Sequence, residues 1–406
     1  MTKESIVILN GARTPMTEWV GGRTGGGKPG GALKDLSAID LGAIAAKEAL
    51  VRSKVPADIL DHVVMGNAMQ TSGDALYGAR HVGLKAGVPV PVPALTVNRL
   101  CGSGIQAIIS AAQLCQLGEA SFVLAGGMES MSQAPFVIRG ARSGLRLGQT
   151  NAFEDSLMVA LRDTFCGLFM AETSDNLARR YNISREEQDA FAVRSITEGR
   201  RAIDSGVLAE EIVPVTIPGR EAKVVDKDDH CFDGATPEGL AKLQPAFGKN
   251  SFVTAGNASG IVDGAAALVL TTERHAEKRD LAPMGRIASW AVTGVDPDQM
   301  GIGPVPAVRG ALKQAGLSVD DVDLFEINEA FAGQFLAVEK ELGNPREKTN
   351  VNGGAIALGH PLGATGTRLT LTLLYELRRR KKRWGVASAC IGGGQGIAIV
   401  VEALPS

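Results

Sequence analysis

The chain has 406 residues, 45% of them hydrophobic and 4% aromatic, and its formal net charge is -2. This charge balance does not favour nucleic acid or an anionic membrane as the main partner, and the length exceeds what one hydrophobic core usually supports, so we expect several domains or a duplicated one. The 50 glycines show no triplet repeat, which excludes a collagen-like chain and suits a tightly turned α/β protein.

Cysteine usage and the N-terminus indicate the compartment. The five cysteines are dispersed and form no CxxC pair, so neither a disulfide framework nor a zinc site is favoured. The first residues run directly into the apolar segment 6–9 without the features of a signal or transit peptide. No apolar run approaches the roughly 20 residues of a membrane span. We therefore expect a soluble, cytoplasmic protein.

The first third of the chain alternates short apolar runs with helical patterns. We expect strands over 6–9, 62–66, 94–97 and 122–127, and helices over 36–54, 77–86 and from 101 to about 115. The glycine-rich stretch 21–31 superficially resembles a phosphate-binding loop. Pro29 stands where that loop requires a magnesium-binding Ser or Thr, so we interpret the stretch as an exposed loop.

Between about 131 and 260 the pattern changes. Charges are denser, strand-like runs are fewer, and the expected helix 184–205 starts at a capping serine and is solvated on one side. We interpret this part as a large insertion that covers a scaffold. The α/β pattern then returns, with strands expected over 263–270, 324–327, 385–390 and 396–402 and helices over 305–315, 331–342 and 365–380.

An internal echo connects the two halves. In the first half, Thr96-Val97-Asn98 precedes a Gly-Ser-Gly helix start and then a strand that ends in two glycines, 126–127. In the second half, 350–352 precedes a Gly-Ala-Thr-Gly helix start and then a strand that ends in three glycines, 392–394. Two copies of one βαβ-rich unit explain both the length and the echo.

Four segments place reactive side chains beside glycines. Cys101 lies where strand 94–97 turns into a helix, and the unpaired N–H groups of a helix start stabilise a thiolate. Asn328, His360 and Cys390 lie in the segments 328–331, 359–363 and 390–394. Reactive groups collect at strand ends in open α/β sheets, so the two-copy interpretation brings all four together.

Side-chain chemistry indicates what such a group does. An imidazole activates a thiol nucleophile, a second thiol moves a proton, and backbone N–H groups at Cys101 and in 392–394 hold an oxyanion. Each motif alone is more often structural: a free cysteine is usually buried and inert, and three glycines are usually a turn. All four together are much harder to attribute to chance.

The chain resembles the thiolase family along essentially its whole length. The resemblance is carried by the segments 97–104, 255–260, 328–332, 353–363 and 390–396. It implies a duplicated five-layered αβαβα fold, with one core half formed by 1–130 plus 262–282 and the other by 283–406. The inserted loop domain, 131–261, then binds coenzyme A and takes part in oligomerisation, usually as a tetramer of tight dimers.

The resemblance also implies a role for each motif. Cys101 becomes the acyl-accepting nucleophile, activated by His360, and Cys390 becomes the acid/base that removes or returns the α-proton of acetyl-CoA. Asn328 fixes a water that, with His360, stabilises the enolate oxygen, and the N–H groups of Cys101 and Gly392 form a second oxyanion hole.

The implied reaction is ping-pong. CoA cleaves a 3-oxoacyl-CoA through an acyl-Cys101 intermediate to acetyl-CoA and a shortened acyl-CoA, or two acetyl-CoA condense in the reverse direction, without a metal or redox cofactor. By the same resemblance, the residues that contact CoA or the acyl-CoA are Met170, Ala246, Phe247, Ala255, Ser259, Gly260, Met300 and Phe331.

The chain departs from the family pattern at two places. Short-chain, biosynthetic-type thiolases carry a His-Met pair where this chain has Phe169-Met170. This difference favours a degradative 3-ketoacyl-CoA thiolase over an acetyl-CoA acetyltransferase specific for acetoacetyl-CoA. An arginine that some relatives direct at the CoA phosphates is replaced near Phe232, and we interpret the basic run 378–383 as a solvated cluster at a helix C-terminus rather than as its substitute.

Two other interpretations stay open. A decarboxylating condensing enzyme on the same fold uses a cysteine with two histidines, whereas the motifs here supply one histidine, Asn328 and Cys390. A non-catalytic CoA- or lipid-binding relative is expected to have lost its nucleophile or base, and this chain has both. Two thiols in one pocket also raise the hypothesis that Cys101 and Cys390 form a regulatory disulfide under oxidation.

Overall fold

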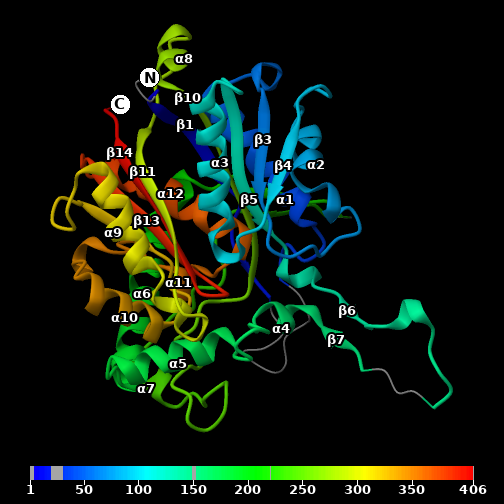
Figure 1. Cartoon of the computed structure of the whole chain (residues 1–406), viewed down its shortest axis with the longest axis vertical. Helices are drawn as coiled ribbons and strands as arrows, with labels where there is room; N and C mark the ends of the chain where they lie inside the picture. The colour runs from blue at the N-terminus through cyan, green and yellow to red at the C-terminus, as the bar shows by residue number, and fades with distance from the viewer. Residues whose placement is uncertain (1–3, 20–30, 149–151, 220, 406) are drawn as a thin grey trace.

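The computed structural model of the chain describes residues 4–19, 31–148, 152–219 and 221–405 (Figure 1). The glycine-rich stretch that we expected as an exposed loop lies almost entirely outside the described residues. Both termini of the chain lie at the same end of the molecule, the upper end in Figure 1.

A ten-stranded mixed sheet runs through the molecule in the order β12-β13-β14-β11-β1-β10-β5-β3-β4, with β2 paired to β10. The antiparallel strand β1 pairs with β10 on one side and β11 on the other, so it joins two halves of the sheet. The strands are β1 (Ile6–Arg13), β2 (Thr17–Glu18), β3 (His62–Gly66), β4 (Ala94–Val97), β5 (Phe122–Glu129), β10 (Val262–Thr272), β11 (Gly285–Gly294), β12 (Leu324–Ile327), β13 (Trp384–Ile391) and β14 (Gln395–Ala403).

Three apolar cores separate five layers. An outer core lies between the first half-sheet and the helices α1 (Ala38–Ser53) and α2 (Gly78–Lys85), and a central core surrounds α3 (Ser103–Leu117) and α12 (Leu362–Arg379). The third core packs α9 (Pro304–Ala315) and α10 (Ala332–Leu342) on the far side of the second half-sheet. The layers therefore follow the expected helix–sheet–helix–sheet–helix order, with α12 in the middle of the molecule in Figure 1.

The central position of α12 follows from its composition. Leucines occur on several sides of the helix and nearly every residue from 362 to 377 is buried, as in a helix that is covered all round. The neighbouring helix α3 has the length and hydropathy of a membrane span over 100–117, but 56% of that segment is buried inside the protein. Its apolar residues face the central core, so α3 is explained as a core helix of the fold.

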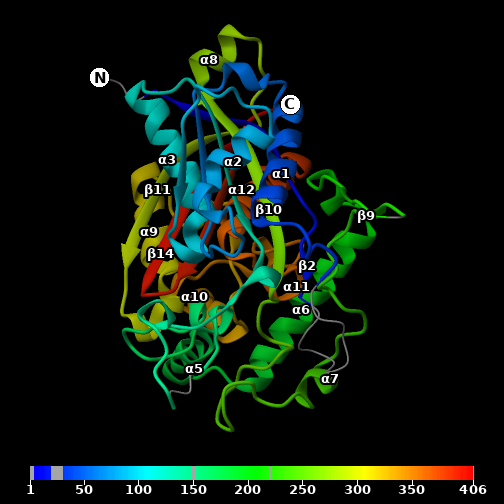
Figure 2. The same cartoon turned by 90° about the vertical axis from the view of Figure 1, so that its right-hand side faces the viewer.

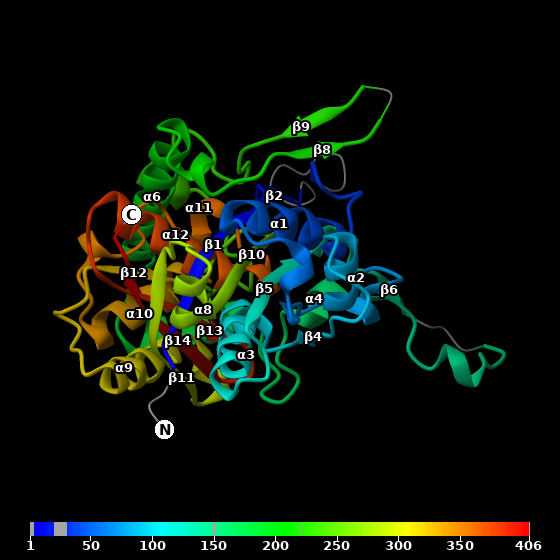
Figure 3. The same cartoon turned by 90° about the horizontal axis from the view of Figure 1, so that it is seen from above.

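The segment between β5 and β10 lies beside and below the layered core (Figures 1 and 2). A two-stranded arm and a second hairpin extend away from the body (Figure 3). Two short helices, α8 (Glu273–Lys278) and α11 (Ala355–Leu358), lie outside this segment. The segment between β5 and β10 contains β6 (Phe136–Val137), β7 (Glu154–Asp155), α4 (Ser156–Ala160), α5 (Met170–Arg180), α6 (Arg185–Asp204), β8 (Val215–Ile217), β9 (Lys223–Val225) and α7 (Pro237–Ala241).

Candidate active site

Cys101 lies in a single 3-10 turn, Leu100–Gly102, between β4 and α3. The expectation that the α-helix starts at Cys101 was wrong by two residues, because the α-helix begins at Ser103. The cysteine packs against a small apolar cluster that includes Met131 and Leu362. The turn therefore points the thiol at the segment that carries His360, two residues before Leu362.

A close approach of α3 and α12 brings the two halves of the site together. A Cβ atom at Gly104 would lie 2.4 Å from the backbone nitrogen of Thr367, and one at Gly366 would lie 2.4 Å from the backbone nitrogen of Ile105. Only glycine permits this contact between the first turns of two helices. The Gly-Ser-Gly and Gly-Ala-Thr-Gly segments of the internal echo thus meet in space.

His360 is buried and its tautomer follows from its neighbours. Its Nδ1 lies 2.6 Å from Oγ1 of Thr365, and that hydroxyl donates to the carbonyl of Pro361 at 3.0 Å. Because the Thr365 hydroxyl donates its proton to the Pro361 carbonyl, its oxygen accepts the Nδ1–H of the imidazole. The Nε2 atom carries a lone pair, and burial, with a smaller effect of Arg368, lowers the pKa of His360 to about 3.

Asn328 follows β12 and reaches the same imidazole. Its Nδ2 lies 3.3 Å from Nε2 of His360, and its backbone N–H donates to the carbonyl of Ser388 at 2.9 Å. The side chain is fully buried, and its Oδ1 atom has no hydrogen-bond partner within the described part of the chain. A buried amide oxygen of this kind is available to accept a hydrogen bond from a bound molecule.

Cys390, near the end of β13, completes the group. It is fully buried and packs with Met300 and Ala330, with Met170 and Phe331 beside them. The backbone N–H of Gly392 faces the Cys101 thiol closely enough to lower its pKa, though less than burial raises it. The structure thus brings Cys101, His360, Asn328, Cys390 and Gly392 into one place, although they come from segments up to 291 positions apart.

The ionisation states differ from the sequence-based expectation for Cys101. Burial raises the pKa of the Cys101 thiol to about 11, and the lowering contributed by the N–H of Gly392 is smaller. Burial and the neighbouring Cys101 also raise the pKa of Cys390. Desolvation therefore outweighs the helix start, and both thiols are protonated at neutral pH beside a neutral imidazole that is able to accept a proton.

Glu129 is a buried carboxylate that the sequence analysis did not identify. Its carboxylate accepts backbone N–H groups from Ala68, Met69 and Gly363 at 2.8–3.0 Å, and the amide of Asn67 at 2.8 Å. Burial raises the pKa of this fully buried carboxyl to about 7. It ties β5 to the first turn of α12. The motif Gly126-Gly127-Met-Glu ends a strand, and nothing in its pattern distinguishes it from an ordinary turn.

A cavity of about 220 Å³ opens onto His360. Leu161 and Phe169 are among the lining residues that were not predicted as CoA contacts. The ring centroids of Phe169 and Phe247 lie 5.5 Å apart. Met300 is not among the lining residues and packs beside Cys390 instead. The remaining predicted CoA contacts line this one cavity: Met170, Ala246, Phe247, Ala255, Ser259, Gly260 and Phe331.

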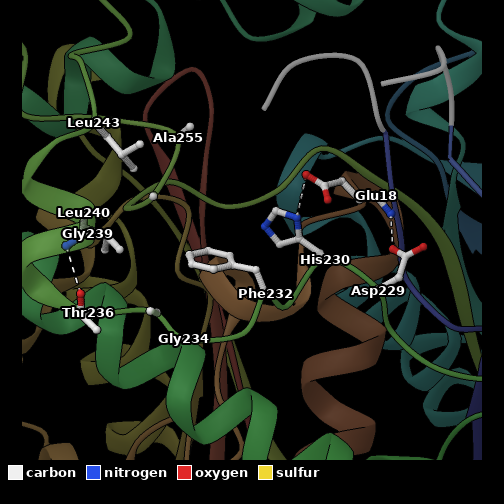
Figure 4. A pocket seen from close by; sticks show the side chains of 12 residues that line it. Glu18, Asp229, His230, Phe232, Gly234, Thr236, Gly239, Leu240, Leu243 and Ala255 are labelled. Atoms are coloured by element: carbon white, nitrogen blue, oxygen red, sulfur yellow. Dashed lines mark hydrogen bonds and ion pairs between the residues drawn. The ribbon is translucent and has the colours of Figure 1, made fainter. Parts of the chain in front are cut away.

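A second cavity, of about 490 Å³, adjoins the first at Ala255 (Figure 4). The ring of Phe232 projects into it from one side, opposite Leu243 on the other. The carboxylate of Glu18 and the imidazole of His230, 3.4 Å apart, line it on the side away from Leu243. The two cavities share Ala255 in their linings, both linings are mostly apolar, and His360 lines the smaller one.

The basic run 378–383 is not a free cationic cluster. Arg379 and Arg380 both pair with Glu376, and Arg383 pairs with Glu402 at 2.7 Å. Lys382 lies 3.7 Å from Asp323. Within the described ranges, no three His, Cys, Asp or Glu side chains converge as a metal ion would require.

The comparisons with known proteins agree with this geometry. The thiolase N-terminal domain matches residues 6–274 and the thiolase C-terminal domain matches residues 281–403. Human mitochondrial 3-ketoacyl-CoA thiolase is 51% identical over 381 residues, covering 94% of this chain and 96% of the relative. A beta-ketothiolase of Cupriavidus necator is 46% identical over 404 residues, covering 99% and 100%.

Solved structures are equally similar. The crystal structure of human mitochondrial 3-ketoacyl-CoA thiolase in complex with CoA superposes with a TM-score of 0.93 at 48% identity, covering 99% of this chain and 98% of that one. A Bacillus anthracis acetyl-CoA acetyltransferase superposes with a TM-score of 0.94 at 45% identity, with 99% of each chain covered.

The duplicated five-layered fold and a site that gathers two thiols and one imidazole are those of an acyltransferase. The chain belongs to the thiolase family. The matched residues include Cys101 in the N-terminal domain and Asn328, His360 and Cys390 in the C-terminal domain.

Proposed function

We propose that the chain catalyses thiolytic cleavage of 3-oxoacyl-CoA through an acyl-Cys101 intermediate. The observation that carries this proposal is the placement of His360, whose Nδ1 is held by the Thr365 hydroxyl while its Nε2 lies beside Asn328, in a segment that packs through Leu362 against Cys101. His360 takes the thiol proton as the sulfur attacks the 3-oxo carbon. The C2–C3 bond then breaks, and acetyl-CoA enolate leaves an acyl-thioester on Cys101.

The other residues act on the enolate and on the second half-reaction. His360, now protonated, and a solvent molecule held by Asn328 stabilise the enolate oxygen, and Cys390 supplies the proton that completes acetyl-CoA. The N–H groups of Cys101 and Gly392 stabilise the tetrahedral oxyanion when CoA attacks the acyl-thioester. Condensation of two acetyl-CoA uses the same steps in reverse, with Cys390 removing the α-proton.

The two adjoining cavities fit the shape of CoA. The smaller cavity, lined by Ser259, Phe247 and His360, has the mostly apolar lining suited to pantetheine and the acyl group. The wider cavity beyond Ala255 then takes the nucleotide, where the Phe232 ring offers a stacking surface. The human relative of similar structure has been solved in complex with CoA, which supports CoA as the ligand of this chain.

We place the chain with the degradative 3-ketoacyl-CoA thiolases. The ring of Phe169 lines the cavity where biosynthetic-type relatives place a histidine, and the human 3-ketoacyl-CoA thiolase is 51% identical. Thiolysis of 3-oxoacyl-CoA from C4 to C16 tests the proposal. We expect kcat/KM to be higher at C6 or beyond than at C4; turnover confined to C4 would favour the alternative, an enzyme specific for acetoacetyl-CoA.

We also propose that the chain forms a homo-oligomer. The arm that carries β6 and β7 extends from the body (Figure 3), and its exposed apolar side chains include Phe136, Leu147 and Phe153. The edge strand β4 leaves Leu95 46% exposed. Exposed apolar surfaces of this kind mark contacts between chains. Light scattering coupled to size-exclusion chromatography should give a dimer or a tetramer; a monomer would contradict the proposal.

A further inference from the structure

The residue before Cys101 has an unusual backbone conformation. Leu100 has a φ of 46°, in the left-handed region, which costs a bulky L-residue roughly 1–3 kcal/mol. Among the described residues with positive φ other than glycine, Leu100 is the only one with an apolar side chain; the others are Lys, Asn or Asp. The conformation requires support from its surroundings.

Two side chains supply this support. The hydroxyl of Ser103 accepts the N–H of Arg99 at 2.9 Å and donates to the carbonyl of Leu100 at 2.7 Å, so it bridges the turn on both sides of the strained residue. The side-chain oxygen of Asn98 accepts the N–H of Leu100 at 2.9 Å. Ser103 is fully buried, so water does not compete for its hydroxyl.

The strained turn packs directly against the glycine loop that follows β13. A Cβ atom at Gly102 would lie 2.5 Å from Cδ1 of Ile391, and one at Gly392 would lie 3.3 Å from Cδ1 of Leu100. The N–H of Gly392 also faces the Cys101 thiol closely enough to lower its pKa. Relaxation of Leu100 to an ordinary φ would therefore displace the thiol from this N–H group.

We propose that Ser103 is a positioning residue that holds Leu100 in the left-handed conformation and thereby fixes Cys101 against the N–H of Gly392. The inference rests on the proposed role of Cys101 as acyl acceptor. Ser103 acts through the turn rather than on the substrate. A nucleophile displaced by a fraction of an ångström loses much of the rate that its orientation supplies.

The test compares Ser103→Ala with two double variants, Leu100→Gly/Ser103→Ala and Leu100→Ala/Ser103→Ala. The acylation rate of Cys101 by 3-oxohexanoyl-CoA is measured by rapid quench and mass spectrometry, and KM by steady-state thiolysis. Ser110→Ala is the matched control, because this serine also lies on α3 but only accepts a side-chain hydrogen bond from Gln106. The melting temperature of each variant is recorded.

We expect Ser103→Ala to slow acylation about 10- to 100-fold with KM changed less than about twofold. Leu100→Gly should restore at least about tenfold of that loss, because glycine adopts positive φ without steric cost. Leu100→Ala should restore nothing, because it removes the same side chain but keeps the Cβ atom. If Ser103→Ala does not fold, the same contrast is expected in folding: Gly restores it and Ala does not.

Three results would overturn the inference. Acylation of Ser103→Ala at the wild-type rate would show that the hydroxyl is not needed, and equal rescue by Gly and Ala would show that side-chain packing, not backbone conformation, is at fault. Rescue by neither would show that Ser103 does not act through the strain at Leu100. Failure of the wild-type protein to form acyl-Cys101 would instead overturn the proposed function and this inference with it.

Discussion

The side-chain amide of Asn328 lies 3.3 Å from the Nε2 atom of His360, and the opposite ring nitrogen is held by Thr365 at 2.6 Å. The imidazole is thereby fixed from both sides in one tautomer, with its lone pair directed into the site. This relationship couples the end of β12 to the segment before α12, so the second half of the chain supplies a preassembled base for a nucleophile from the first half.

Replacing Thr365 tests the tautomer. In Thr365→Val the Nδ1–H loses its acceptor while the shape of the side chain is kept, so the buried ring is free to take the other tautomer. We expect kcat for thiolysis to fall about 10- to 100-fold, with KM for CoA nearly unchanged. Thr370→Val is the control, because Oγ1 of Thr370 donates only to a carbonyl of its own helix. Equal losses in both variants would contradict the assignment.

The pH dependence of Cys101 alkylation follows from its burial. A pKa of about 11 for the thiol and about 3 for His360 leave the pair neutral across the physiological range. Because only the thiolate is alkylated, the rate with iodoacetamide should rise about tenfold per pH unit between pH 6 and 9. A rate that is independent of pH below 7 would show a preformed thiolate–imidazolium pair and contradict this account.

We expect substitutions of the two thiols, Cys101 and Cys390, to affect different half-reactions. Cys101→Ser should lose nearly all turnover, because it lacks the acyl acceptor. Cys390→Ser should impair condensation of acetyl-CoA, which needs the α-proton removed, while it keeps part of the acyl transfer to CoA. Acyl exchange between labelled CoA and acetyl-CoA isolates the second activity. Equal loss of exchange and condensation in Cys390→Ser would contradict separate roles for the two thiols.

Chain-length preference should depend on Phe169. Its ring lies against Phe247 in the wall of the cavity, with the guanidinium of Arg162 5.7 Å from its centroid on the outside. Phe169→Ala removes this wall and should raise the ratio of kcat/KM for C16 over C4 substrates at least about threefold. Phe165→Ala is the control, since Phe165 is 88% exposed on the same loop. An unchanged ratio in Phe169→Ala would show that another residue limits the acyl group.

The buried ion pair beneath the site should dominate local stability. Arg368 on α12 and Glu326 on β12 are 3.0 Å apart and almost completely buried. Removing one partner of a buried ion pair typically costs about 3–5 kcal/mol, and because burial raises the pKa of Glu326 to about 8, Arg368→Met should lower the free energy of unfolding by that amount only above pH 8, where the carboxyl is ionised. Arg274→Met, which breaks a mostly exposed pair with Glu4, should cost less than about 1 kcal/mol. Denaturant titration above pH 8 measures the free energy of unfolding of both variants. Equal losses in Arg368→Met and Arg274→Met would contradict this prediction.

Much of this architecture was predictable because its signals are local. The apolar runs predicted β1, β3, β4, β5, β10, β12, β13 and β14, and the helical periodicity predicted α1, α9, α10 and α12 to within a few residues. β11 (Gly285–Gly294) was missed because Arg286, Ser289 and Thr293 interrupt its apolar residues, a register shift between Ile287 and Ser289 breaks the alternation, and its partners β1 and β14 lie far away in the sequence.

The site was predictable in its residues but not in its electrostatics. Cys101 and His360 beside glycines, and Asn328 at the end of a strand, are visible in the sequence, whereas the raised pKa of Cys101 depends on burial by residues such as Leu362 from the other half of the chain. Glu129 and Thr365 escaped notice for the same reason. Their roles come from partners such as Gly363 and His360, whose positions only the packed structure defines.

The most direct measurement is the mass of the wild-type protein after reaction with 3-oxohexanoyl-CoA in the absence of free CoA. We expect one butyryl group per chain, located on the tryptic peptide that contains Cys101, together with released acetyl-CoA. The group should disappear when CoA is added, because the second half-reaction removes it. No mass gain, or a butyryl group on Cys390 instead of Cys101, would contradict the account.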